Sequence, residues 1–188
     1  MNDYETYEVR VYKNGDKLWY QNDELHRTDG PAVEWASGTK YWYQNDKLHR
    51  TDGPAVEYSD GFKAWYQNNE YHRTDGPAVE YTSGTKEWWI DGKRHRADSP
   101  AIEYANGDKY WYQNDKRHRT DGPAIEYADG SKHWYQNGVP HRTDGPAIEL
   151  GNGYKKWWLD GNEYSFSEWC EKTNLSREEK CELVLMYG

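Results

Sequence analysis

One stretch decides the fold: residues 38–58, which read GTKYWYQNDKLHRTDGPAVEY. The same pattern returns every 23 residues, and its histidine column recurs without any insertion. The members of this column are His26, His49, His72, His95, His118 and His141. A strict period of this length is typical of repeat proteins, in which each unit is stabilised by its neighbours. We expect six full units from Gly15 onward and a seventh that begins at Gly153 and departs from the pattern after Gly161.

Each unit is predicted to be one β-hairpin. Residues 40–44 are rich in β-forming side chains and alternate, which indicates a strand. The next pair, Asn45-Asp46, has hairpin-turn chemistry. The chain then returns, is interrupted at Asp52-Gly53-Pro54, where proline cannot donate to a ladder, and resumes over residues 55–58. The sequence therefore predicts an all-β fold, an elongated antiparallel array of β-hairpins arranged as a meander or solenoid.

Before the repeats, which occupy residues 15–164, residues 1–14 are expected to form an N-terminal capping strand. Within them, residues 4–12 look like the incoming strand of a half repeat. Open sheets need capped ends, because an uncovered edge strand offers unpaired backbone groups to other chains.

Residues 165–188 are predicted to form a helical cap. The spacing Ser165 to Glu168 is that of a capping box, and the same spacing recurs at Ser176. We expect two short helices, over about 166–173 and 177–186. The apolar residues expected to cover the last hairpin are Trp169, Leu175, Val184 and Leu185.

Composition narrows the class of protein. Aromatic residues are abundant, with 11 Trp and 18 Tyr among 188 residues, so aromatic packing is expected to hold the sheet together. The formal net charge of −9 argues against binding to a nucleic-acid backbone. The sequence has no apolar run long enough to predict membrane insertion, and it does not start with a basic and apolar leader, so we expect a cytoplasmic protein. Cys170 and Cys181 are expected to be free thiols.

The form Trp-Tyr-x-Asn-x-x-x-His-Arg-x-Asp-Gly-Pro-Ala, seen at residues 42–55, resembles the MORN repeat. It is more similar to the MORN-variant repeats of bacterial antitoxin-like proteins. Together with the Leu-Ser-Arg-Glu-Glu-Lys segment at 175–180, it looks most like bacteriophage-encoded repeat proteins. The resemblance implies a phage-encoded protein that acts in the host bacterial cytoplasm by occupying or inhibiting a host protein, such as a defence or toxin component.

Several columns are identical between units, and each has a structural interpretation. The histidines of neighbouring units are too far apart for a shared metal ion, so we expect each imidazole to bond a nearby backbone group or the Asp of its own block. The Trp column is expected to pack under the stem of the lysine two residues earlier. Arg73, Arg96 and Arg119, with their equivalents, are expected to pair with the Asp and Glu columns. The alternative for these three arginines is an anion site, which would make the protein a small-ligand or nucleotide sponge.

The position between Lys and Trp varies between units and lies on the face opposite Trp. We interpret this variable column, beside the aromatic residues that follow Trp, as the surface that binds a protein partner. The predicted partner-binding residues are Tyr41, Tyr43, Tyr66, Glu87, Trp89, Tyr110, Tyr112, His133 and Tyr135. No nucleophile, phosphate loop or metal motif indicates an enzyme, and no cofactor is expected. A structural scaffold and a homodimer that pairs through a sheet edge stay open as alternatives.

Overall fold

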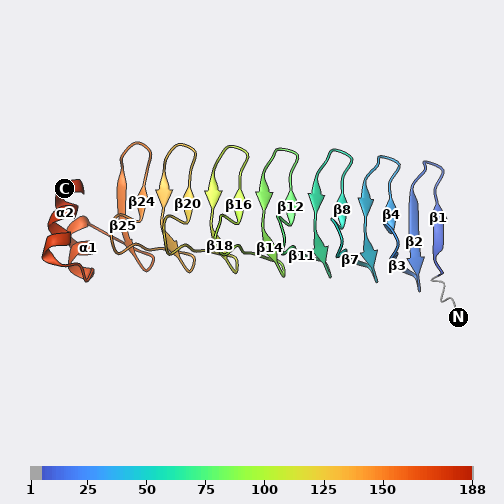
Figure 1. The fold of residues 1–188 in the computed structure, drawn as a ribbon, viewed down its shortest axis with the longest axis horizontal. Coiled ribbons are helices and arrows are strands. Elements are labelled where there is room, and N and C mark those ends of the chain that lie inside the picture. The colour runs from blue at the N-terminus through green and yellow to red at the C-terminus, as the bar shows by residue number, and fades with distance from the viewer. Residues whose placement is uncertain (1–5, 188) are drawn as a thin grey trace. The chain divides into compact units, whose positions relative to one another are not determined.

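The computed structural model describes residues 6–187 (Figure 1). Within them the chain forms 26 strands and two helices. The chain divides into two units, Met1–Arg94 and His95–Gly188, each of which is described by itself. Residues 1–5 of the predicted capping strand and Gly188 lie outside the described residues. The all-β array of antiparallel hairpins with a C-terminal helical cap is confirmed, whereas its elongated shape stays a prediction.

The first unit is an antiparallel sheet in which most neighbours in sequence are also neighbours in space. Its strands are β1 (Glu8–Val11), β2 (Lys17–Gln21), β3 (Glu24–Leu25), β4 (Val33–Glu34), β5 (Lys40–Tyr41), β6 (Tyr43–Gln44), β7 (Lys47–Leu48), β8 (Val56–Glu57), β9 (Lys63–Ala64), β10 (Tyr66–Gln67), β11 (Glu70–Tyr71), β12 (Val79–Glu80), β13 (Lys86–Glu87), β14 (Trp89–Ile90) and β15 (Lys93–Arg94). The order β1-β2-β4-β5-β8-β9-β12-β13 makes the main sheet. The pairs β6-β7, β10-β11 and β14-β15 are small separate hairpins, and β3 pairs with β2.

The second unit continues the same plan and ends in the helices. Its elements are β16 (Ile102–Glu103), β17 (Lys109–Tyr110), β18 (Tyr112–Gln113), β19 (Lys116–Arg117), β20 (Ile125–Glu126), β21 (Lys132–His133), β22 (Tyr135–Gln136), β23 (Val139–Pro140), β24 (Ile148–Glu149), β25 (Lys155–Leu159), β26 (Asn162–Tyr164), α1 (Phe166–Lys172) and α2 (Arg177–Tyr187). The main sheet has the order β16-β17-β20-β21-β24-β25-β26.

The strand predicted over residues 40–44 is wrong in one respect, because it breaks at Trp42. β5 belongs to the main sheet and β6 to a small hairpin with β7. Trp42 has no ladder partner, because the strands on its two sides, β4 and β8, begin only at Val33 and Val56, after Pro31 and Pro54, although the N–H of Trp42 still donates to the carbonyl of Ala55 at 2.8 Å. β2 does not break at Trp19, because Val9 of β1 pairs with it there.

The predicted turns are confirmed by backbone angles. Asn45 and Asp46 have φ of 50° and 58°, as a two-residue hairpin turn of type I′ requires. At the other end of the repeat, the N–H of Gly38 bonds the carbonyl of Trp35, and Gly38 has φ of 93°. Glycine adopts this conformation without the steric cost that a Cβ brings, which explains the glycine at this position in every unit.

The buried part of each repeat is small. Ala55 is 0% and Val56 is 4% exposed, and their equivalents in the other repeats are mostly buried too. The remaining stability therefore has to come from contacts of half-buried aromatic and charged side chains.

The C-terminal cap forms as expected, with one correction. Ser165 caps α1, accepting from the N–H of Glu168 and completing a capping box. Trp169 is 0% exposed and packs with Leu183, which is 5% exposed. The expectation for Val184 and Leu185 is wrong: they are 51% and 88% exposed, because they lie away from the side of α2 that carries Leu183. Among residues 6–187, no helix is long and apolar enough to cross a membrane.

Candidate functional site

One face of the sheet carries a column of stacked arginine and tryptophan side chains. The guanidinium of Arg50 lies over the Trp42 ring, 4.1 Å from its centroid. Its Nε donates to Asp52 at 2.8 Å, and Nη1 donates to Glu57 at 3.3 Å. Equivalent stacks join Arg27 to Trp19, Arg73 to Trp65, Arg119 to Trp111 and Arg142 to Trp134. The cation over the indole is thus this arginine, and the expectation that the preceding lysine covers it is wrong: Lys40 is exposed.

The glycine of the Asp-Gly-Pro block lies against the arginine guanidinium of this column. A Cβ built on Gly53 would lie 2.7 Å from Cζ of Arg50, closer than any real contact. The guanidinium therefore lies between the indole of Trp42 and the backbone of Gly53. The same short approach is found at Gly30, Gly76, Gly122 and Gly145. This contact explains the glycine column by close approach.

The arginines proposed as an alternative anion site are already occupied by the fold. Arg73 pairs with Asp75 at 2.8 Å and with Glu80 at 3.3 Å, and Arg119 pairs with Asp121 and Glu126, both at 2.9 Å. Arg96 pairs with Glu103 at 2.9 Å. The structure therefore contains the ion pairs expected between these columns. A phosphate would have to compete with two carboxylates at Arg73 and at Arg119.

These ion pairs lower the pKa of the aspartates. The hydrogen bond from Arg50, followed by its charge, holds the pKa of Asp52 below its ordinary value. Asp75 and Asp121 are lowered in pKa for the same reason by Arg73 and Arg119. The carboxylates are therefore kept ionised at neutral pH.

The histidines connect neighbouring repeats. Nδ1 of His26 accepts from the backbone N–H of Asn45, in the turn of the next repeat, at 3.3 Å. The same bond links His49 to Asn68, His72 to Asp91, His95 to Asn114, His118 to Asn137 and His141 to Asp160. The expected bond to a backbone group is confirmed, whereas the Asp of the same block is not the partner. Nδ1 of His26, His72 and His141 also lies 2.7–2.8 Å from the side-chain Oδ1 of the same turn residue, so the turn offers this nitrogen both a donor and an acceptor.

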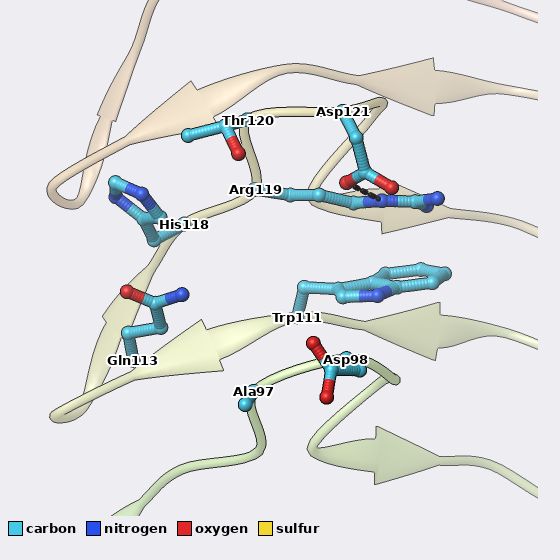
Figure 2. A pocket seen from close by; sticks show the side chains of 8 residues that line it. All are labelled: Ala97, Asp98, Trp111, Gln113, His118, Arg119, Thr120 and Asp121. Atoms are coloured by element: carbon cyan, nitrogen blue, oxygen red, sulfur yellow. Dashed lines mark hydrogen bonds and ion pairs between the residues drawn. The ribbon is translucent and has the colours of Figure 1, made fainter.

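Cavities lie between successive Arg-x-Asp loops on this face, where x is Thr or, in the fourth repeat, Ala97. Figure 2 shows one of them: Arg119 lies flat above Trp111 and is paired with Asp121, while Asp98 lies on the other side of the indole. His118 and Gln113 line its side.

Four such cavities have volumes between about 210 and 540 Å³. Each is lined by one glutamine: Gln44, Gln67, Gln113 or Gln136. Within the described residues, the side-chain amides of these glutamines make no hydrogen bond to the protein.

The opposite face of each unit carries a row of aromatic rings. In the first unit, Tyr41 contacts Tyr58 at 6.1 Å between ring centroids, Tyr58 contacts Phe62 at 5.0 Å, and Phe62 contacts Tyr81 at 5.5 Å. In the second unit, Tyr104, Tyr110, Tyr127 and His133 follow one another at 5.1, 5.8 and 5.1 Å. We call these eight residues, together with Trp35, which precedes its turn as Tyr58 and Tyr81 precede theirs, the aromatic row.

The variable column belongs to this row and is less free than the sequence indicates. Tyr41 is half-buried and lies opposite Val33 and Val56 in the register, and burial followed by a hydrogen bond with Tyr58 raises its pKa to about 12. Ala64, in the same column, is 0% exposed, and the ring at this point of the row comes from Phe62. Tyr41 and Ala64 are therefore held by packing, whereas in the fourth unit the column carries Glu87 and the position equivalent to Phe62 carries Thr85, so no ring is supplied there.

None of the nine predicted partner-binding residues is fully exposed. Tyr112 is buried, and the other eight are half-buried: Tyr41, Tyr43, Tyr66, Glu87, Trp89, Tyr110, His133 and Tyr135.

Several of the nine are held by polar or cation contacts. Trp89 Nε1 donates to Glu87 at 2.8 Å. Arg117 lies over Tyr110 and Tyr135, and its Nε donates to the Tyr112 hydroxyl. The structure thus brings Tyr110, Tyr112 and Tyr135 together around one arginine.

Four exposed rings of this face were not predicted. Trp35, Tyr58, Tyr81 and Tyr104 are 38–43% exposed. Each stands two residues after a buried Val or Ile, just before the turn. The signal was present in the sequence, because an aromatic residue recurs there with the same period as the histidines.

The described residues offer little chemistry beyond these two faces. Within residues 6–187, no group of three or more His, Cys, Asp or Glu side chains could hold a metal ion. Cys170 and Cys181 are free thiols, as expected. No family model matches the chain, and a search of curated proteins found no significant match.

Proposed function

We propose that the protein is a non-enzymatic binding protein and that its aromatic row binds a protein partner. One observation carries the proposal: Trp35, Tyr58, Tyr81 and Tyr104 remain 38–43% exposed although neighbouring rings are packed around them. Tyrosine and tryptophan are enriched at protein interfaces, where they supply large contact area at low entropic cost. A row of them across several strands provides such a surface.

The cellular part of the proposal rests on the resemblance to MORN-variant and phage-encoded repeat proteins. It makes the partner a host bacterial protein, such as a defence or toxin component, and the place of action the host cytoplasm. Nucleic acid is a poorer candidate, because the arginines that would hold phosphates are paired with carboxylates.

The experiment compares two double variants of the same repeats on opposite faces. Tyr58→Ser with Tyr81→Ser removes rings from the aromatic row, and Gln44→Ala with Gln67→Ala changes the other face. Affinity capture from bacterial lysate with quantitative mass spectrometry identifies a partner, and calorimetry then measures both variants against it. We expect the tyrosine variant to lose about 2 kcal/mol or more of binding free energy and the glutamine variant to bind as the wild type does. The reverse result would refute the proposal.

A second candidate function has an observation of its own. The four cavities repeat the same polar groups, and within residues 6–187 their glutamine amides make no hydrogen bond to the protein. The neighbouring arginines are neutralised, so the cavities suit an uncharged polar ligand better than an anion or nucleotide. Screening by differential scanning fluorimetry with uncharged polyhydroxy compounds and with nucleotides tests this candidate. It is abandoned if no compound gives a shift that disappears in the Gln44→Ala, Gln67→Ala variant.

A further inference from the structure

Among residues 6–187, no second strand pairs with the outer edge of β1 in the first unit. β1 is the first strand of the sheet, and within residues 6–187 it pairs only with β2. All four of its residues are exposed, and Val9 and Val11 are 46% and 66% exposed. By contrast, the last strands of the second unit, β25 and β26, are packed against α1. An exposed edge with apolar side chains is a template for pairing with another strand.

The hydrogen-bond pattern shows which backbone groups of β1 point outward. The N–H of Tyr12 donates to the carbonyl of Asp16 at 2.9 Å, at the turn end of the β1–β2 ladder. In an antiparallel ladder, such bonded positions alternate with positions whose backbone groups point to the other side. Arg10 and Glu8 therefore point their backbone groups toward β2, and Val9 and Val11 point theirs toward the open edge.

This alternation limits how a second copy of β1 could pair with the first. When a two-fold axis relates two identical antiparallel strands, the residue numbers of every opposing pair add up to the same sum. Only an even sum places residues whose backbone groups point toward the open edge opposite each other. An axis at Glu8 would set Glu8 opposite Glu8, and an axis at Arg10 would set Arg10 opposite Arg10. Like charges directly opposite each other destabilise a ladder.

An axis at Val9 avoids both conflicts. It pairs Val9 with Val9 of the second copy through the outward N–H and C=O groups. It also sets Glu8 opposite Arg10 twice, at the closely spaced, non-hydrogen-bonded positions where cross-strand side chains meet. We propose that two copies of this chain pair antiparallel through β1, with the two-fold axis at Val9. The interface is isologous, as most homodimer interfaces are.

The charged side chains are already arranged for this pairing. Arg10 Nε donates to Glu8 at 2.7 Å along the strand, and the Arg10 guanidinium lies over the Tyr20 ring, 4.2 Å from its centroid. Both residues are thus held on one side of β1. A second copy would complete a ring of four alternating charges, in which each carboxylate lies between two guanidinium groups.

The first test uses backbone chemistry. Sedimentation velocity over a range of concentrations should show the wild-type chain in a monomer–dimer equilibrium. Val9→Pro removes an outward N–H, which an edge strand tolerates, and should leave the protein folded and monomeric. A wild-type chain that stays monomeric at every concentration would overturn the proposal, as would a Val9→Pro variant that dimerises like the wild type.

The second test fixes the register by charge. Glu8→Arg sets arginine opposite Arg10, and Arg10→Glu sets glutamate opposite Glu8, so each variant alone should dimerise about tenfold more weakly or worse. An equimolar mixture should recover dimers, because a Glu8→Arg chain presents only arginine to a chain that presents only glutamate. Glu163→Arg makes the same charge change in β26 and should dimerise like the wild type.

These variants and their mixture also distinguish the axis at Val9 from the other registers. With the axis at Arg10, Glu8→Arg would dimerise as well as the wild type, and that outcome would refute the axis at Val9. Failure of the mixture to recover dimers would refute it too. The interface is independent of the aromatic row, so a monomeric chain would leave the proposed partner binding standing, and loss of partner binding would leave the dimer standing.

Discussion

A glycine-to-alanine change gives the most direct test of how the repeats are stabilised. In Gly76→Ala the new Cβ would lie 2.7 Å from Cζ, 2.9 Å from Nη2 and 3.0 Å from Nε of Arg73. Gly76 does not have the positive φ that disfavours alanine, so the backbone itself accepts the change. The guanidinium must therefore move, and it is held on its other face by Trp65, 4.0 Å from the ring centroid.

The expected loss of stability follows from the contacts that Arg73 would lose. Nη1 donates to the carbonyl of Pro77 at 3.1 Å, and hydrogen bonds of charged groups are worth about 1.5–3 kcal/mol. The cation–π contact adds about 0.5–1 kcal/mol. Alanine returns about 0.4–1 kcal/mol by restricting the unfolded chain. The balance is a net destabilisation of about 2 kcal/mol.

The fourth repeat shows the same relation without mutagenesis. Ser99 stands there in place of the glycine, and its arginine, Arg96, has a side chain that is 31% exposed. The corresponding arginines of the other full repeats are 17–22% exposed: Arg27, Arg50, Arg73, Arg119 and Arg142. A residue with a Cβ at this position therefore goes together with a more exposed guanidinium, and the repeat still folds. This agrees with a moderate loss of folding free energy in Gly76→Ala.

The assay is urea denaturation followed by tryptophan fluorescence, applied as a double-mutant cycle. We expect Gly76→Ala to lose about 2 kcal/mol in the wild-type background and to be neutral or slightly stabilising when Arg73 is already alanine. If Gly76→Ala costs the same with and without Arg73, the contact between Gly76 and the guanidinium is not what the glycine serves. A wild-type-like Gly76→Ala would refute the argument altogether.

Three further predictions concern pH and the cap. Burial raises the pKa of Tyr41 to about 12, so the neutral phenol favours the folded state: this stability is intact below pH 10 and is lost as pH rises toward 12. Phenolate absorbance should show a late-titrating tyrosine that Tyr41→Phe removes, and an unchanged titration would contradict this. Asp52 has a pKa below its ordinary value of 3.8, so its contribution is present above that pH and is lost as pH falls through the lowered pKa. Acid unfolding should therefore be less steep in Asp52→Asn, and an identical acid profile would argue against the pair. Leu183→Ala should cost about 2–4 kcal/mol in urea denaturation and Leu185→Ala no more than about 0.5 kcal/mol; similar losses would mean that the cap packs differently.

The features that could be predicted from the sequence are those set by neighbours along the chain. The turn at Asn45-Asp46 requires residues that accept positive φ, and the helix at Ser165 requires an N-cap, so local chemistry indicated both. Contacts between units were harder to predict. His26 bonds a turn 19 residues away, in the next repeat. In an array with a strict period, each residue type also occurs one period later, so the sequence cannot tell a bond within one block from a bond to the next.

The identity of the cation over tryptophan was missed for a related reason. Lys40 precedes Trp42 by two residues, which places both side chains on the same side of a strand, whereas Arg50 comes eight residues later. The hairpin brings Arg50 back, and Asp52 and Glu57 hold its guanidinium over the indole. Lysine has no planar group to be held in this way, so the geometry favours arginine once the chain has turned.

Identity between repeats therefore has different meanings on the two faces. On the face of Trp42 and Arg50, stacking, ion pairing and the close approach of Gly53 each favour one residue type, so nearly identical columns follow from packing alone. On the opposite face packing is less restrictive: the ring at one point of the row comes from Phe62 beside Ala64, and the fourth unit carries Thr85 and Glu87 at these two positions. Variation there is compatible with a constant framework, and it changes which rings and polar groups reach solvent. A partner that reads this face would distinguish one repeat from another, whereas a ligand in the cavities of the other face would meet nearly the same site in each.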